Sequence, residues 1–132
     1  MSSEQIPENI KRFILRSIDS VSYLEAMLLL RYDPKKEWDA RTMAQGLFIS
    51  EKRADELLGN LCAAGIAAVH EGSERLYRYN PISPELRDMI NQLSRIYSSN
   101  LIEVTNLIHS KTGRQAQEFG DAFKWSDPKE DP

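Results

Sequence analysis

Basic, amide and hydroxyl side chains recur through the middle of the chain, with types and spacing suited to contacts with a nucleic acid. Lys52 and Arg53 stand near the expected start of a helix, where such residues meet phosphates and base edges. On the same expected helix, Asn60 has the chemistry to bond adenine, and Glu56 can accept a hydrogen bond from cytosine. The candidate DNA contacts are Arg41, Thr42, Ser50, Lys52, Arg53, Glu56, Asn60, Arg75 and Arg78.

Carboxylates on the same segment oppose this interpretation. Glu51, Asp55 and Glu56 outnumber Lys52 and Arg53 on the expected helix, and a carboxylate that faces a phosphate repels it. Lys52 and Glu56 are one helical turn apart, so they can instead form an ion pair on a solvated face. Contact with DNA and plain solvation therefore both stay open for this helix.

Patterns for catalysis or metal binding are missing from the sequence. His70 and His109 are far apart, and neither stands at a metal-ligand spacing from Cys62. Gly72 and Ser73 fit a hairpin tip rather than a phosphate-binding loop, and no nucleophile-elbow pattern occurs. Cys62 is expected as a small core residue. We therefore predict that the protein is not an enzyme and uses no metal or cofactor.

Local signals between Trp38 and Pro81 define the elements that would position the candidate contacts. Asp39 can cap a short helix and Ser50 can cap a second one, by accepting hydrogen bonds from the N–H groups of the first turn. Gly65 can end the second helix in the left-handed conformation, which carries no steric penalty for glycine. The inward stripe of the second helix is expected to be Ala54, Leu57, Leu58 and Leu61.

The turn between these helices and the segment after them complete the pattern. Gly46 disfavours a continuous helix, and Phe48 and Ile49 are expected as the apolar residues of a buried turn. Residues 66–70 and 75–79 alternate like strands, on either side of a polar tip. Two helices followed by a hairpin predict a winged helix-turn-helix, an α+β fold that is mainly α with a small β-hairpin.

Helices are expected on both sides of that segment. An apolar stripe predicts one helix over residues 6–18, and a nearly all-apolar segment predicts another over 21–32. Ser83 and Pro84 open a long helix that is expected to run to about residue 110. The expected organisation is a flexible N-terminus over 1–5, a winged-helix domain with flanking dimerisation helices over 6–110, and a C-terminal tail over 111–132 whose last residues are disordered.

The expected long helix carries a heptad seam with one internal asparagine. A single Asn in such a seam commonly fixes register and oligomeric state. Because one 15.1 kDa domain offers little to cover two apolar helix faces, we predict a homodimer. The alternative is an ordinary helix packed on its own domain, and a break at residues 98–100 would favour that alternative. The candidate interface residues are Leu86, Ile90, Leu93, Tyr97, Asn100, Val104 and Leu107.

Composition fits a small cytoplasmic protein. A chain of 132 residues can form one domain with a modest core, and its one cysteine, Cys62, allows no internal disulfide. No apolar run approaches the roughly 20 residues needed to span a bilayer, and no signal-peptide pattern opens the chain. The net charge of −3 counts against tight, non-specific binding to nucleic acid. We expect no membrane partner.

The segment from Asp39 to Pro81 resembles bacterial winged-helix regulators of the MarR-like kind, in its LFIS turn, its LLGNLCAAGI helix end and its LYRYNP strand. The continuation SPELRDMINQLSRIYSSNLIEVTNLIHS and the tail EFGDAFKW are similar to a narrower group of these proteins, whose function is generally unassigned. The resemblance implies a dimeric winged-helix protein associated with transcription.

The sequence therefore leaves two functions open. One is a regulator of transcription that binds DNA through the winged helix-turn-helix, as a homodimer. The other is a winged-helix module that binds a protein partner and has little or no affinity for DNA. Continuous positive potential across the wings would favour the first, and a neutral or acidic surface would favour the second.

Overall fold

The fold is mainly helical and carries one small β-hairpin, which confirms the predicted α+β class. The structure, a computed structural model, describes residues 6–110, so the predicted flexible N-terminus and C-terminal tail lie outside the described residues. A further helix over residues 101–110 follows the last of the named elements. These elements are α1 (Glu8–Ser17), α2 (Val21–Tyr32), α3 (Ala40–Leu47), α4 (Glu51–Ala63), β1 (Ala67–Glu71), β2 (Arg75–Tyr79) and α5 (Pro84–Ser99).

Helices α3 and α4 begin at the predicted caps. The Asp39 carboxylate accepts from the Thr42 N–H at 2.8 Å, and the Thr42 hydroxyl accepts from the Asp39 N–H at 3.0 Å. Hydrogen bonding by the Thr42 N–H is the main cause that lowers the pKa of Asp39. The Ser50 hydroxyl accepts from the Arg53 N–H at 3.1 Å and caps α4. Each cap satisfies an N–H group that has no partner inside its helix.

The end of α4 turns at Gly65, as predicted. Gly65 has φ of +78°, in the left-handed region. The Ile66 N–H donates to the Leu61 carbonyl at 2.9 Å and the Gly65 N–H donates to the Cys62 carbonyl at 3.0 Å. This pair of hydrogen bonds is the Schellman arrangement, which closes the last turn and sends the chain out of the helix into β1.

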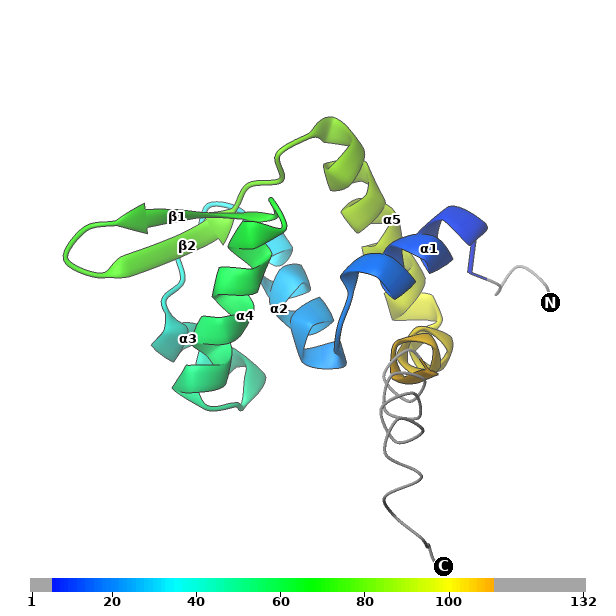
Figure 1. Ribbon diagram of the computed structural model, residues 1–132, viewed down its shortest axis with the longest axis horizontal. Coiled ribbons are helices and arrows are strands. Elements are labelled where there is room, and N and C mark those ends of the chain that lie inside the picture. The colour runs from blue at the N-terminus through cyan, green and yellow to red at the C-terminus, as the bar shows by residue number, and fades with distance from the viewer. Residues whose placement is uncertain (1–5, 111–132) are drawn as a thin grey trace, which may run out of the picture.

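The hairpin, or wing, is a two-stranded antiparallel sheet in which Ala67 pairs with Tyr79 and Glu71 with Arg75. On its other side β2 forms one isolated bridge, between Tyr77 and Trp38. The two residues exchange N–H···O=C hydrogen bonds of 2.8 and 2.7 Å. This bridge ties the wing to the segment that leads into α3, so the helix-turn-helix and the hairpin form one unit (Figure 1).

The core is centred on α2, which lies between the α3–α4 pair and the α1–α5 pair (Figure 1). Leu24, Met27 and Leu30 of α2 are completely buried. The predicted inward stripe of α4 is buried in full, and Ile10, Ile14 and Ile18 of the N-terminal segment are completely buried as well. Packing on several sides explains why α2 is apolar nearly all round.

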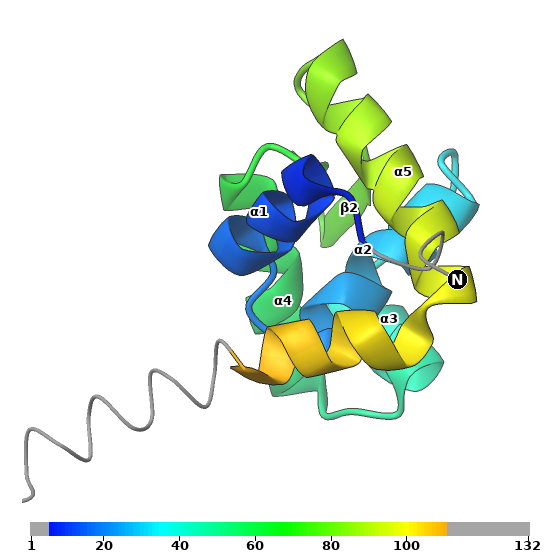
Figure 2. The ribbon, with the colours of Figure 1, turned by 90° about the vertical axis from the view of Figure 1, so that its right-hand side faces the viewer.

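The prediction of one continuous helix from residue 84 to 110 is wrong. Asn100, at φ −134° and ψ 48°, ends α5, and a new helix runs over residues 101–110 in a different direction (Figure 2). The hydroxyls of Ser98 and Ser99 each donate to the Arg95 carbonyl at 3.0 Å. Such side-chain bonds compete with the helical backbone, and a run of Ser-Ser-Asn offers three of them in succession.

Substituting Gly65 should destabilise the fold through the backbone and through contact with Ile82. A Cβ added at Gly65 would lie 2.8 Å from Ile82 Cδ1, and a residue with a side chain resists this φ. Gly65→Val should therefore lower the free energy of unfolding by at least about 1–2 kcal/mol. Gly59 is the matched control, because a Cβ there meets open space inside α4. Gly59→Ala should raise it by up to about 1 kcal/mol. Urea titration measures the free energy of unfolding of both variants, and equal changes in the two would contradict the left-handed conformation assigned to Gly65.

Alkaline pH should weaken the fold through Tyr23. Burial, the larger cause, and the negative charge of Asp19 together raise the pKa of Tyr23 from 10.0 to about 12. A pKa that is higher in the folded state gives stability that is complete below pH 10 and is lost as the pH rises toward 12. Two pKa units correspond to roughly 2–3 kcal/mol. Tyr23→Phe removes this proton linkage, so its free energy of unfolding should fall less steeply above pH 10 than that of the unaltered protein.

Candidate nucleic-acid interface

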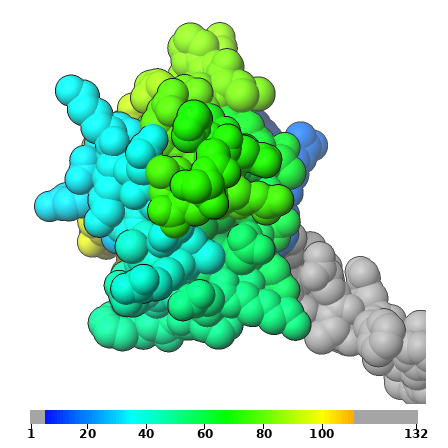
Figure 3. All heavy atoms as spheres, turned by 90° about the vertical axis from the view of Figure 1, so that its left-hand side faces the viewer, coloured from blue at the N-terminus to red at the C-terminus, as the bar shows by residue number. Residues whose placement is uncertain are grey.

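The outer face of α4, the wing and α3 lie together on one side of the molecule (Figure 3). Lys52 and Glu56 are exposed along α4, as the helical spacing predicts, and Asn60, which flanks that stripe, is exposed as well. Gly59 is exposed between them and leaves the helix backbone uncovered. This is the surface that a winged helix-turn-helix can present to a groove of DNA.

Arg53 does not point outward as an independent contact. Its Nη2 donates to the Ser20 hydroxyl, at the start of α2, at 3.4 Å. Its Nη1 lies 3.5 Å from a carboxylate oxygen of Glu56, so the two candidate contacts form an ion pair with each other. The guanidinium thereby joins α4 to the α1–α2 junction, and this tertiary contact could not be deduced from helical spacing.

Thr42 and Ser50 are committed to the ends of helices. The Thr42 hydroxyl accepts from the Asp39 N–H and donates to the Asp39 carbonyl at 3.2 Å. The Ser50 hydroxyl accepts from the α4 backbone, which leaves its proton for another acceptor. The structure therefore gives both residues a local role, and only Ser50 retains a donor for a phosphate.

Carboxylates balance the basic residues of the wing. Tyr77 first, and then the carboxylates of Glu71 and Asp55, raise the pKa of Arg75. Asp55 belongs to α4, so the outer helix face places negative charge beside the wing arginine. Arg41 and Arg78 are exposed. From Trp38 to Pro81 the sequence has five basic and six acidic residues, so this face lacks the positive excess that is usual for DNA binding.

The predicted dimer seam faces the core of its own chain, so the prediction that it is an exposed interface is wrong. Ile90, Leu93 and Val104 are completely buried in one protomer, and Tyr97 and Asn100 are at least nine-tenths buried. Leu86 and Leu107 are partly buried against the same core. Ile90 and Leu93 belong to α5, which contacts α1, and the break at Asn100 folds the helix over residues 101–110 back onto the domain so that Val104 is buried as well (Figure 2).

Phe48, expected in a buried turn, is instead 94% exposed. It is also the one residue other than glycine with positive φ in the described part of the chain, at +59°. The Ile49 N–H donates to the Ala44 carbonyl at 3.1 Å, which closes the end of α3 and turns the Phe48 side chain outward. Glycine is the usual residue at such a position. An aromatic ring that fills no space in its own fold is a candidate contact with a partner.

An apolar groove of about 350 Å³ borders the same end of α3. Tyr32, at its rim, is 86% exposed. Gly46 lies inside α3 rather than ending it. A Cβ added at Gly46 would come to 3.2 Å from Leu29 Cδ1 of α2. The close approach of α3 to α2 thus requires a small residue. The groove is lined by Glu25, Leu28, Leu29, Tyr32, Gly46, Leu47 and Tyr97.

The sites considered for catalysis offer little chemistry. No group of three His, Cys, Asp or Glu residues that could hold a metal ion occurs within residues 6–110. Cys62 is partly buried, and burial raises the pKa of its thiol, which lowers the fraction of reactive thiolate. His70 is exposed on β1. None of the helices in this part of the chain has the length and apolar character required to traverse a bilayer.

Comparison with known proteins gives one distant likeness. No family model matches the chain, and no curated protein matches it. Among solved structures, it is similar to the crystal structure of RV1404 from Mycobacterium tuberculosis, with 13% identity and a TM-score of 0.49. That alignment covers 92% of this chain and 86% of the other.

Because Leu93 is completely buried in one chain, substitutions at this position can distinguish a core residue from a dimer-interface residue. Leu93→Ala should lower the free energy of unfolding by about 2–5 kcal/mol, because it leaves a cavity inside one chain. Leu93→Glu should prevent folding at any protein concentration, as measured by circular dichroism together with light scattering. A Leu93→Glu protein that stays folded and becomes a monomer would show instead that the seam joins two chains.

Proposed function

We propose that the protein is a regulator of transcription that binds DNA through α4 and the wing. The observation that supports this proposal most strongly is the outer face of α4. It is unoccupied by the described part of the chain, its start is capped, and it carries exposed Lys52 and Asn60. With α4 in a major groove, Lys52 would meet phosphate or guanine at the leading end and Asn60 would reach adenine.

The wing and α3 would contribute contacts to the DNA backbone. Arg41 on α3 and Arg78 on β2 are exposed and have the chemistry to neutralise phosphates on either side of α4. Asp55 and the Arg53–Glu56 pair limit the electrostatic attraction. Binding should therefore depend on sequence-specific contacts, and affinity for arbitrary DNA should be weak. A homodimer would double these contacts, with an interface outside the buried seam.

A second candidate function is a winged-helix module that binds a protein. The exposed Phe48 ring and the apolar groove beside α3 favour this function, since the ring lies outside the core and no candidate DNA contact lines the groove. The balance of charge on the face formed by α4 and the wing points the same way, because protein interfaces depend less on positive charge than DNA interfaces do.

Selection of bound fragments from the source genome, followed by salt titration, tests the proposal. Lys52→Ala should weaken binding to a selected fragment by about 1–3 kcal/mol if the contact is bidentate to guanine. Arg78→Ala should weaken binding to all sequences alike and should make the salt dependence less steep. Glu56→Gln should either change the sequence preference or, by releasing Arg53 and removing a charge, tighten non-specific binding.

Arg12→Ala is the matched control. Arg12 is exposed on α1, at the opposite end of the molecule from the wing, so its loss should leave DNA affinity unchanged (Figure 1). Suppose that no salt-sensitive binding to genomic fragments is found at low ionic strength, and that Glu56→Gln does not restore it. The protein-binding function would then replace the DNA-binding one.

A further inference from the structure

A second polar cluster lies between α2, the end of β2 and α5, and none of its residues is a candidate DNA contact. Arg31 of α2 donates from Nε to Asn91 Oδ1 at 2.8 Å and from Nη1 to the Ser94 hydroxyl at 3.3 Å. Arg87 of α5 stacks over the Tyr79 ring, with its Cζ 5.5 Å from the ring centre. Residues from three separate elements therefore converge here.

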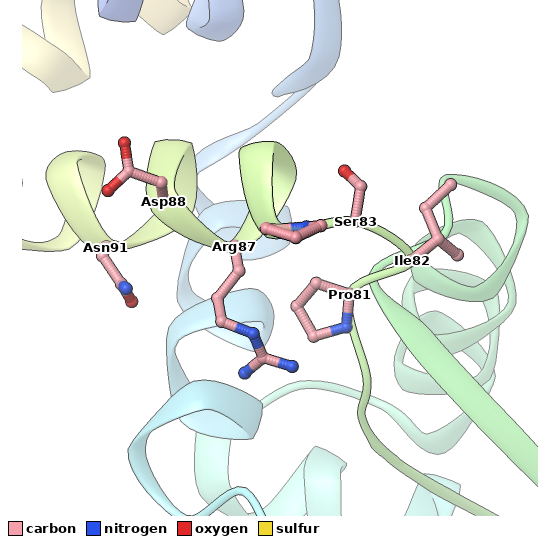
Figure 4. A pocket seen from close by; sticks show the side chains of 7 residues that line it. Pro81, Ile82, Ser83, Arg87, Asp88 and Asn91 are labelled. Carbon is pink, nitrogen blue, oxygen red and sulfur yellow. The ribbon is translucent and has the colours of Figure 1, made fainter.

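Among residues 6–110, two positive charges in this cluster have no carboxylate partner. Within residues 6–110 neither Arg31 nor Arg87 comes within ion-pair distance of a carboxylate. Arg31 is partly buried and bonds only to neutral groups. Asp88 of α5 lines the adjoining pocket as well, although Figure 4 shows its side chain projecting from the opposite side of the helix to Arg87 and Asn91. Its carboxylate accepts instead from Gln92 at 2.7 Å.

The Tyr79 hydroxyl is a buried polar group in the same place. Tyr79 is 6% exposed, and its oxygen has no hydrogen-bond partner among the described residues. Burial raises the pKa of Tyr79, although Arg87 and Arg31 act in the opposite direction, so the phenol keeps its proton and can donate. A buried donor without a partner is unfavourable. A water could satisfy the hydroxyl, but it would not compensate the two positive charges.

The cluster adjoins a pocket. The pocket has a volume of about 410 Å³ and is lined by residues of the 81–84 connection and by Arg87, Asp88 and Asn91 of α5. In Figure 4 the Arg87 side chain extends beside Pro81, on the side of α5 from which Asn91 also projects. Solvent can thus reach the Arg87 guanidinium, and Asn91 links the pocket to Arg31.

We propose that an oxyanion, a carboxylate or phosphate group, binds where this pocket meets the cluster, held by Arg87 at the pocket wall and by Arg31 and the Tyr79 hydroxyl behind it. Guanidinium groups bind both kinds of oxyanion through charge-assisted hydrogen bonds, and a phenol adds a third donor. Arg31 is held in place by Asn91 and Ser94, so the site is partly organised before the ligand arrives. The ligand would connect β2 to α2 and α5. The proposal goes beyond DNA binding and does not depend on it.

Thermal unfolding with inorganic phosphate or with acetate, against chloride at equal ionic strength, tests this site. At least one of the two anions should raise the Tm to a plateau, and Arg87→Gln should abolish that rise. Arg95→Gln is the matched control, because Arg95 is exposed further along α5 and should leave the rise unchanged. A response to phosphate alone, to acetate alone or to both would support the site and would define the oxyanion.

Tyr79→Phe separates ligand binding from a structural role. In chloride it should be at least as stable as the unaltered protein, since it removes a buried hydroxyl without a partner. With phosphate or acetate it should lose part or all of the rise in Tm. The proposal is overturned if neither anion gives a saturating rise, or if the rise survives in Arg87→Gln.

Discussion

The requirement to bury α2 on several sides organises the whole domain. Helix α2 is apolar on nearly every face, so it must be covered by other elements before the chain is stable in water. Helices α3 and α4 cover one side, β2 packs against it, and the helix over residues 101–110 closes the arrangement. Gly46 of α3 lies against Leu29 of α2, where an added Cβ would come to 3.2 Å from Leu29 Cδ1. The orientation of α4, and with it the outward face, follows from this packing.

Most of the fold could be predicted from local signals, because several of them agreed. Ser50, Gly65 and the apolar stripe of α4 each act within one or two turns of helix, so neighbouring residues alone determine their conformation. The break at Asn100 was harder to foresee. The spacing of the apolar residues continues across it, while the Ser-Ser-Asn side chains compete with the helical backbone. Val104 and Ile108, beyond the break, are completely buried in the core, and local spacing does not reveal such long-range packing.

The candidate sites were less predictable, because they depend on contacts between distant segments. Helical spacing correctly placed Lys52 and Glu56 outward, but it could not show that Arg53 reaches Ser20 or that Asp55 lies near Arg75. The cluster around Tyr79 joins residues that are tens of positions apart. Phe48 was placed wrongly, because its apolar character suggested burial, whereas the direction of its side chain is set by the left-handed turn.

The bridge between Trp38 and Tyr77 affects how the hairpin behaves toward other chains. An exposed strand edge presents unpaired N–H and C=O groups on which a second molecule can add a strand. Backbone hydrogen bonds from Trp38 occupy the outer edge of β2 at Tyr77, and Lys36 lies over the Trp38 ring at 4.1 Å. Within residues 6–110 no strand pairs with the outer edge of β1, which is short and ends in His70 and Glu71. Because β1 is short and ends in a charged residue, its edge disfavours edge-to-edge aggregation of the hairpin.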